Sequence, residues 1–176
     1  PIILVEWTLF TFFILRFGGQ LSIQKWLQPA RGPVLWSILA VLVGFLPITV
    51  FLSFYETLAP WTVWVPWLLL ALLNPWLEEF YWRGLLLDFT SSWKPFWAIL
   101  YVSLFFSFNH AVFGLYSEVN QGPEVITVTL ILGMIWGWTY HKTGSLRWCL
   151  LGHFLVDFFN LSVPAFLDLF EKTPIW

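Results

Sequence analysis

The chain has 176 residues, of which 59% are hydrophobic and 22% aromatic, and only 10% carry a charge. A soluble domain has about 25% charged residues, so this composition excludes an ordinary soluble domain and a disordered segment. The net charge of −2 and the single cysteine exclude a nucleic-acid-binding protein, a disulfide-stapled scaffold and a four-cysteine zinc site. A multi-pass integral membrane protein remains.

Long stretches of the chain contain no Asp, Glu, Lys or Arg. About 20 mostly apolar residues cross the hydrocarbon core of a bilayer, and a helix is the default because each span must satisfy its own backbone hydrogen bonds. We therefore predict one domain over 1–176, an all-α bundle of about six transmembrane helices around a polar cavity. Because the chain opens on Pro1 without a starting Met, we expect a processed or truncated product with room for further helices upstream. The predicted segments are 1–17, 33–54, 61–89, 95–113, 124–141 and 145–163, with a short tail helix at 165–171.

The first segment ends near Gly18 and Gly19, and Glu6 near its start is expected to reach the outer interface. The connection that follows, 18–32, is amphipathic in part, and two interpretations stay open for it. It is either a helix on the membrane surface or a plain loop. The apolar residues that would face the lipid are Leu21, Ile23, Trp26 and Leu27.

Prolines and glycines predict the shape of the later segments. Pro66 and Pro75 lie inside the third segment and should bend it, whereas Pro164 should end the sixth. Gly133 and Gly137 form a G-x-x-x-G pattern in the fifth segment, which favours close packing against another helix.

Basic residues in the connections predict the orientation. The odd-numbered connections carry six basic residues, and the even-numbered ones carry none. By the positive-inside rule, the odd connections are cytoplasmic and both termini lie outside. In a prokaryotic cell the membrane would be the plasma membrane. The six residues are Arg16, Lys25, Arg31, Lys94, Lys142 and Arg147, and Lys172 alone lies on the far side.

Six ionisable residues fall deep inside the predicted spans, where each costs roughly 2.5–3.5 kcal/mol on insertion scales. They are too expensive to face lipid, so we expect them to face one another inside the bundle. They are Glu78, Glu79 and Arg83 in the third segment, His110 in the fourth, and His153 and Asp157 in the sixth.

Helical spacing assigns partners within this set. Glu79 and Arg83 are four residues apart, in the order that favours an ion pair, so we predict a structural pair. Glu78 lies about 100° around the helix and stays free to face a cavity. His153 and Asp157 are also four apart and share a helix face.

This set suits hydrolysis of an amide. A glutamate with a histidine can activate water, and a second histidine with an aspartate can stabilise a developing oxyanion. Glu78, His110 and His153 would also suit a catalytic zinc site with an open position, and the residues alone do not separate a glutamate-type from a metal-dependent mechanism. A non-catalytic alternative also stays open, in which the cluster serves as a proton or solute pathway, or holds a partner helix in an immunity or scaffold protein.

Three motifs carry a family resemblance. Glu78 to Arg83 reads E-E-x-x-x-R, Phe106 to His110 reads F-x-x-x-H, and His153 to Asp157 reads H-x-x-x-D. In this order and on three apolar helices, they resemble the CPBP family, the CAAX-protease and bacteriocin-processing (Abi) intramembrane proteases. The motifs fall within a predicted catalytic core at 75–160.

The resemblance implies an all-helical membrane fold with a conical cavity and endopeptidase activity on membrane-associated, including lipidated, substrates. It implies that Glu78 activates water with the help of His110, while His153 and Asp157 stabilise the oxyanion. Glu79, Arg83 and Phe106 would support the site. The depths of these residues in the membrane do not agree. With odd connections cytoplasmic, His110 lies about 22 Å from the cytoplasmic end of its helix, whereas Glu78 and His153 lie only about 12–15 Å from theirs.

Overall fold

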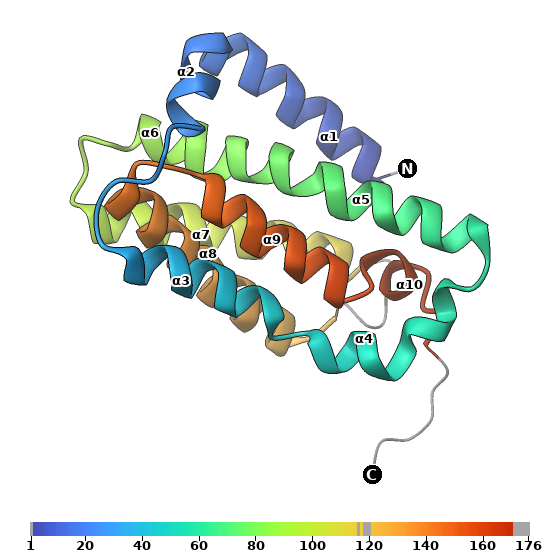
Figure 1. Ribbon diagram of the computed structural model, residues 1–176. Coiled ribbons are helices and arrows are strands. Elements are labelled where there is room, and N and C mark those ends of the chain that lie inside the picture. The colour runs from blue at the N-terminus through green and yellow to red at the C-terminus, as the bar shows by residue number, and fades with distance from the viewer. Residues whose placement is uncertain (1, 116, 118–120, 171–176) are drawn as a thin grey trace.

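The computed structural model describes residues 2–115, 117 and 121–170, and it contains helices and no strand over this part of the chain (Figure 1). Lys172, used in the charge pattern, and residue 171, the last of the predicted tail helix, lie outside the described residues. The first half comprises α1 (Ile2–Phe13), the π-helix η1 (Ile14–Gly18), α2 (Gly19–Trp26), α3 (Val34–Leu42), the 3₁₀ turn η2 (Val43–Phe45), α4 (Ile48–Phe54) and the 3₁₀ turn η3 (Tyr55–Leu58). The second half comprises α5 (Trp61–Glu79), the π-helix η4 (Phe80–Leu86), α6 (Leu87–Phe89), α7 (Pro95–Phe113), α8 (Pro123–Thr143), α9 (Arg147–Phe159) and α10 (Ser162–Phe166).

The all-helical prediction is confirmed, and each of the six predicted segments is helical over most of its length. By length and composition alone, three helices of the described chain are long and apolar enough to cross a membrane: Ile2–Trp26, Val34–Leu58 and Pro95–Phe113. The end of the chain differs from the prediction. Helix α9 stops at Phe159 because Leu161 takes a left-handed conformation with φ of 53°, and Pro164 lies inside α10.

Helix α9 lies at the centre of the arrangement. It packs against α5, α3 and α8, while α7 and α8 pair along their lengths and α1 lies against α5 (Figure 1). The two helices that carry most of the predicted site, α5 and α9, are therefore direct neighbours.

Glycines set the closest helix crossings. A Cβ at Gly133 would lie 3.0 Å from Ser103 Cβ, and one at Gly137 would lie 2.8 Å from Ile99 Cγ2, so the G-x-x-x-G face of α8 packs directly on α7. A Cβ at Gly152 would come within 1.9 Å of the Ala40 carbonyl oxygen. Helix α9 thus approaches α3 so closely that the position excludes any side chain.

The distribution of polarity is that of a membrane protein. Large apolar side chains on the long helices face outward, for example Leu9, Leu52, Trp64 and Phe108. By contrast, the ionisable side chains of Glu78, Glu79 and Arg83 are buried. Soluble proteins do not expose so much contiguous apolar surface. This exterior is suited to the hydrocarbon of a bilayer.

The segment after the first helix is the helix α2 and not a plain loop, although Trp26, one of the residues expected to face lipid, is buried. Gly19, with φ of 72°, turns the chain into α2, and the Trp26 side chain is 1% exposed. Its indole packs on Gly84, where a Cβ would lie 2.7 Å from the ring. Trp26 therefore belongs to the core, while Leu21 on the same short helix is 81% exposed.

Asp88 lies in α6 and joins three elements. Its Oδ2 accepts hydrogen bonds from Lys25 Nζ at 2.8 Å and Trp26 Nε1 at 2.9 Å. Its Oδ1 accepts one from the Tyr140 hydroxyl at 2.9 Å. We call these four residues the Asp88 cluster, and they fasten α2 and α8 to the end of the α5–α6 helix.

Candidate active site

The structure brings five of the six predicted intramembrane ionisable residues into one buried group. Glu78 and Glu79 end α5, Arg83 lies one turn later in η4, and His153 and Asp157 lie on the facing side of α9. Every one of them is at most 7% exposed. We call these five residues the buried ionic cluster.

Glu79 connects the two helices. Its Oε1 accepts a hydrogen bond from Arg83 Nη1 at 2.9 Å, which confirms the ion pair expected from their spacing. The same oxygen lies 2.8 Å from His153 Nδ1. Because a carboxylate oxygen accepts, Nδ1 is the protonated nitrogen, and Glu79 fixes the orientation of the imidazole as well as balancing the arginine.

Aromatic rings hold the cationic members in place. The Arg83 guanidinium lies 4.0 Å from the Phe106 ring centroid, so Phe106 contacts the buried cluster as well as filling the core. The His153 ring stacks on Trp136 with centroids 4.7 Å apart and an angle of 19°. With Glu79 on one edge and Trp136 on one face, the His153 ring has little freedom to rotate.

Glu78 differs from its neighbour in having no hydrogen-bond partner for its buried Oε2. That oxygen lies 3.5 Å from His153 Nε2, and Asp157 Oδ1 lies 3.9 Å from the same nitrogen. Neither distance is that of a hydrogen bond, so Nε2 points between two carboxylates without being committed to either. The segment that follows Glu79 is the π-helix η4, a form of helix found frequently at functional sites.

His110 lies on α7 and reaches the same region despite the depth mismatch in the linear estimate. Its Nδ1 donates a hydrogen bond to the Phe106 carbonyl at 2.9 Å, so Nε2 is the acceptor nitrogen of the neutral ring. His110 lines a small cavity together with Glu78 and Asp157.

Two cavities meet at His110, Asp157 and Asn160. The small one, of about 60 Å³, is bordered by Glu78 and Asn74. The large one, of about 460 Å³, extends past His153 and is lined mostly by apolar side chains between the α3–α4 break, α8 and α9. Its apolar lining residues are Val43, Leu46, Pro47, Phe106, Val125, Val128, Leu132, Trp136 and Val156.

Sequence reasoning missed a polar relay that holds Asp157. Asn74 Nδ2 donates to Asp157 Oδ2 at 3.2 Å, and Trp7 Nε1 donates to Asn74 Oδ1 at 2.8 Å. Asn74 lies one helical turn before Glu78 on α5. An amide inside an apolar span is itself a sign of a polar partner, and this sign was available in the sequence.

The expectation that Glu6 reaches the outer interface is wrong. Glu6 is 8% exposed, and its Oε1 accepts a hydrogen bond from Asn109 Nδ2 on α7. Its charge interacts with Asp157 and with Glu78. Helix α1 therefore adds a fourth carboxylate, Glu6, to the three of the buried ionic cluster. The packing of α1 against α5 places it there.

The residue types allowed a zinc site, and two observations describe how its candidate ligands lie. Within the described part of the chain, no three His, Cys, Asp or Glu side chains are grouped so that they could hold a metal ion. In the candidate set of Glu78, His110 and His153, Glu79 engages one Nδ1 atom and the Phe106 carbonyl the other, so Nε2 is the nitrogen that each ring has left for a ligand.

The family model described as type II CAAX prenyl endopeptidase, Rce1-like, matches residues 60–159. The chain belongs to this family. The match begins just before α5 and ends with α9, so it contains all three motifs and agrees with the CPBP resemblance. Comparisons with curated proteins and with solved structures each found no match.

Membership of the Rce1-like family supports endopeptidase activity within the membrane, and the family acts on membrane-associated protein substrates. The apolar exterior agrees with this assignment. Helices α1 to α4 of this Rce1-like protein lie outside the matched residues, and α1 brings in both Glu6 and Trp7.

Proposed function

We propose that the chain is a glutamate-type intramembrane endopeptidase in which Glu78 activates the attacking water. The observation that carries this proposal is the Glu78 carboxylate itself. It is 1% exposed, its Oε2 lacks a hydrogen-bond partner, and it borders a cavity. A buried carboxylate oxygen without a hydrogen bond is costly for folding, so a catalytic use explains its presence better than a structural one.

The small cavity supports a position for that water. A volume of about 60 Å³ exceeds the ~30 Å³ share of one water molecule in the liquid. Glu78 offers a carboxylate acceptor, and His110 offers Nε2 as a second acceptor, so the two hydrogens of one water have partners. Glu78 then takes one proton as the oxygen attacks the substrate carbonyl carbon.

His153 is proposed to stabilise the oxyanion that this attack creates. Glu79 holds Nδ1–H, so the imidazolium form presents an Nε2–H donor between Glu78 and Asp157. Asp157 favours that charged form electrostatically, and Asn74 holds the Asp157 carboxylate in place. Collapse of the tetrahedral intermediate breaks the C–N bond, and the proton taken by Glu78 passes to the leaving amine.

We propose that the reaction is metal-free, with the zinc-dependent mechanism as the competing reading. This choice is supported by the spacing of the candidate ligands, since within the described residues no three His, Cys, Asp or Glu side chains are grouped so that they could hold a metal ion. Activity that survives extensive dialysis against a chelator, together with no stoichiometric metal in the active protein, would agree. Loss of activity on chelation and its return with Zn²⁺ would overturn the metal-free mechanism.

We also propose six membrane spans, with the odd connections cytoplasmic and a polar site inside the bundle. The membrane would be the plasma membrane if the cell is prokaryotic. The substrate would be a membrane-associated protein or peptide, including lipidated ones, whose chain reaches the site through the large cavity. The mostly apolar lining of that cavity suits a substrate that arrives from the bilayer.

The experiment is cleavage of a fluorescent, prenylated C-terminal peptide by the purified protein in liposomes, with products identified by mass spectrometry. The same peptide without the prenyl group is the matched control. Endoproteolytic products from the wild-type protein support the proposal. Ion flux across the liposome membrane without any cleavage would instead support the pathway alternative and overturn the protease assignment.

A further inference from the structure

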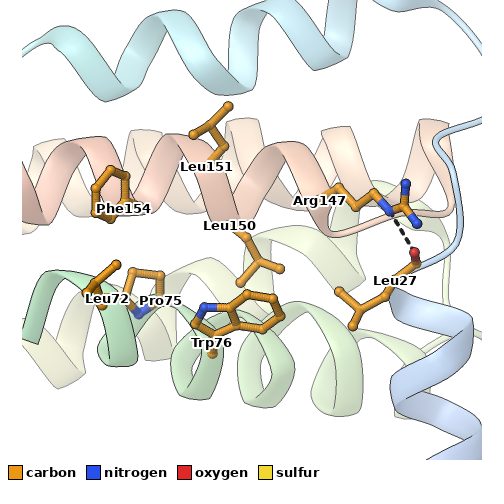
Figure 2. A pocket seen from close by; sticks show the side chains of 8 residues that line it. All are labelled: Leu27, Leu72, Pro75, Trp76, Arg147, Leu150, Leu151 and Phe154. Carbon is orange, nitrogen blue, oxygen red and sulfur yellow. Dashed lines mark hydrogen bonds between the residues drawn. The ribbon is translucent and has the colours of Figure 1, made fainter. Parts of the chain in front are cut away.

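A second groove lies on the outside of the α5–α9 pair, away from the candidate active site (Figure 2). It has a volume of about 460 Å³, and Arg147 is the one charged side chain among its lining residues. None of its residues borders either cavity of the site. Its apolar lining consists of Leu27, Leu72, Pro75, Trp76, Leu150, Leu151 and Phe154.

The groove and the site share a wall. On α5, Pro75 and Trp76 face the groove while Asn74 and Glu78 border the small cavity. On α9, Phe154 faces the groove while its neighbour His153 belongs to the buried ionic cluster. The groove is therefore separated from the site by the thickness of this helix pair.

The groove opens toward the surroundings of the protein. Leu72 is 47% exposed, Trp76 is 45% exposed and Leu151 is 39% exposed. In a membrane these side chains meet lipid hydrocarbon, so the natural filling of the groove is an acyl chain.

Arg147 closes one end of this apolar groove. Its Nε donates a hydrogen bond to the Leu27 carbonyl at 2.7 Å, which holds the guanidinium at the start of α9. Among the described residues, no carboxylate forms an ion pair with it. In Figure 2, one of the two remaining guanidinium nitrogens points away from the Leu27 carbonyl and stays available to an anion. A guanidinium matches the geometry of a phosphate group.

We propose that this groove binds one anionic phospholipid of the bilayer, with its phosphate at Arg147 and one acyl chain along α5 and α9. From Arg147 to Phe154 the helix rises about 10 Å, which fits inside the ~15 Å hydrocarbon half of a bilayer. An unpaired cation at a helix end above an apolar groove selects for a headgroup with net negative charge, because a zwitterionic headgroup brings its own cation.

The test is thermal unfolding of the purified protein in detergent with added dioleoyl-phosphatidylglycerol or dioleoyl-phosphatidylcholine, which have the same chains. Since a ligand of the folded state raises Tm, we expect a larger rise with phosphatidylglycerol. Arg147→Gln should remove this difference and lower the affinity for phosphatidylglycerol at least about tenfold, measured by native mass spectrometry. Lys142→Gln, which removes a basic residue that does not line the groove, should leave the difference intact.

Arg147→Gln also removes the hydrogen bond to the Leu27 carbonyl, which can lower Tm by itself. Comparing the two lipids within each variant cancels that loss of stability. As a second variant, Leu151→Trp should fill the groove and reduce retention of phosphatidylglycerol. Equal stabilisation of the wild type by both lipids overturns the proposal, as does an undiminished phosphatidylglycerol effect in Arg147→Gln. A stable dimer whose formation Leu151→Trp abolishes, with no lipid effect, would show that a second copy covers the groove and would also overturn it.

Discussion

The Asp88 cluster and the buried ionic cluster are both built around carboxylates on one continuous helix, α5–η4–α6. In the Asp88 cluster both carboxylate oxygens accept hydrogen bonds, from Lys25, Trp26 and Tyr140. In the buried ionic cluster, by contrast, Glu78 Oε2, Glu79 Oε2 and Arg83 Nη2 have no hydrogen-bond partner. The cluster that is more deeply buried is thus the one that is less completely satisfied.

Under the proposed mechanism, this difference separates a structural role of the Asp88 cluster from a catalytic role of Glu78. Folding alone favours a complete set of partners, because an unpaired buried polar group costs about 1–3 kcal/mol. Open hydrogen-bonding positions beside a cavity are what a site needs to bind a water molecule and a substrate. Among changes in the buried ionic cluster, we therefore expect those at Glu78 to lower turnover most. Changes in the Asp88 cluster should lower only the stability.

The largest expected effect is that of Glu78→Gln. Glutamine keeps the shape but cannot accept the proton of the attacking water, so turnover of the membrane peptide should fall by about 10²–10⁴-fold. The unfolding midpoint in detergent should change little, because the Glu78 Oε2 atom has no hydrogen bond to lose. Turnover equal to that of the wild type would disprove the role of Glu78.

Glu79→Gln should act on stability as well as turnover. It leaves the buried Arg83 guanidinium without its charged partner, which costs about 3–5 kcal/mol in the free energy of unfolding. The double variant Glu79→Gln/Arg83→Met should recover much of that stability, because an apolar replacement of a buried pair is often neutral. Its turnover should stay low, because the charge that orients His153 is gone. Recovered turnover in the double variant would show that Glu79 serves only Arg83.

Asp88→Ala tests the other side of the comparison. It removes the acceptor for Trp26 and Tyr140 and should lower the free energy of unfolding by about 1–3 kcal/mol. Turnover per folded molecule should match that of the wild type, measured at a temperature where both are folded. A large loss of turnover without a loss of stability would contradict the structural role of the Asp88 cluster.

The smallest expected effect is that of Tyr140→Phe, which removes one of the hydrogen bonds to Asp88. The loss should be about 0.5–1.5 kcal/mol, seen as a small shift of the denaturant midpoint. Because Lys25 and Trp26 still hold Asp88 Oδ2, this variant should be clearly milder than Asp88→Ala. Equal effects of the two variants would mean that Tyr140 alone supplies the stability of the cluster.

The sequence determined the features that depend on local spacing along one helix. The all-helical fold, the Glu79–Arg83 ion pair and the close packing at Gly133 and Gly137 follow from long uncharged apolar stretches, an i,i+4 spacing and residue size. The motifs at Glu78, Phe106 and His153 placed the chain in its family before any contact between helices was known. These properties are local, so the order of the residues is sufficient to predict them.

The tertiary structure decided which side chains meet across helices. It turned Glu6 toward Asn109, brought Asn74 to Asp157, buried Trp26 against Gly84, and made Asp88 a junction of three elements. It also gave Glu79 its second partner, His153, and left Glu78 without a hydrogen bond. The rotation and crossing of each helix depend on contacts far apart in sequence, so spacing within one segment cannot determine them.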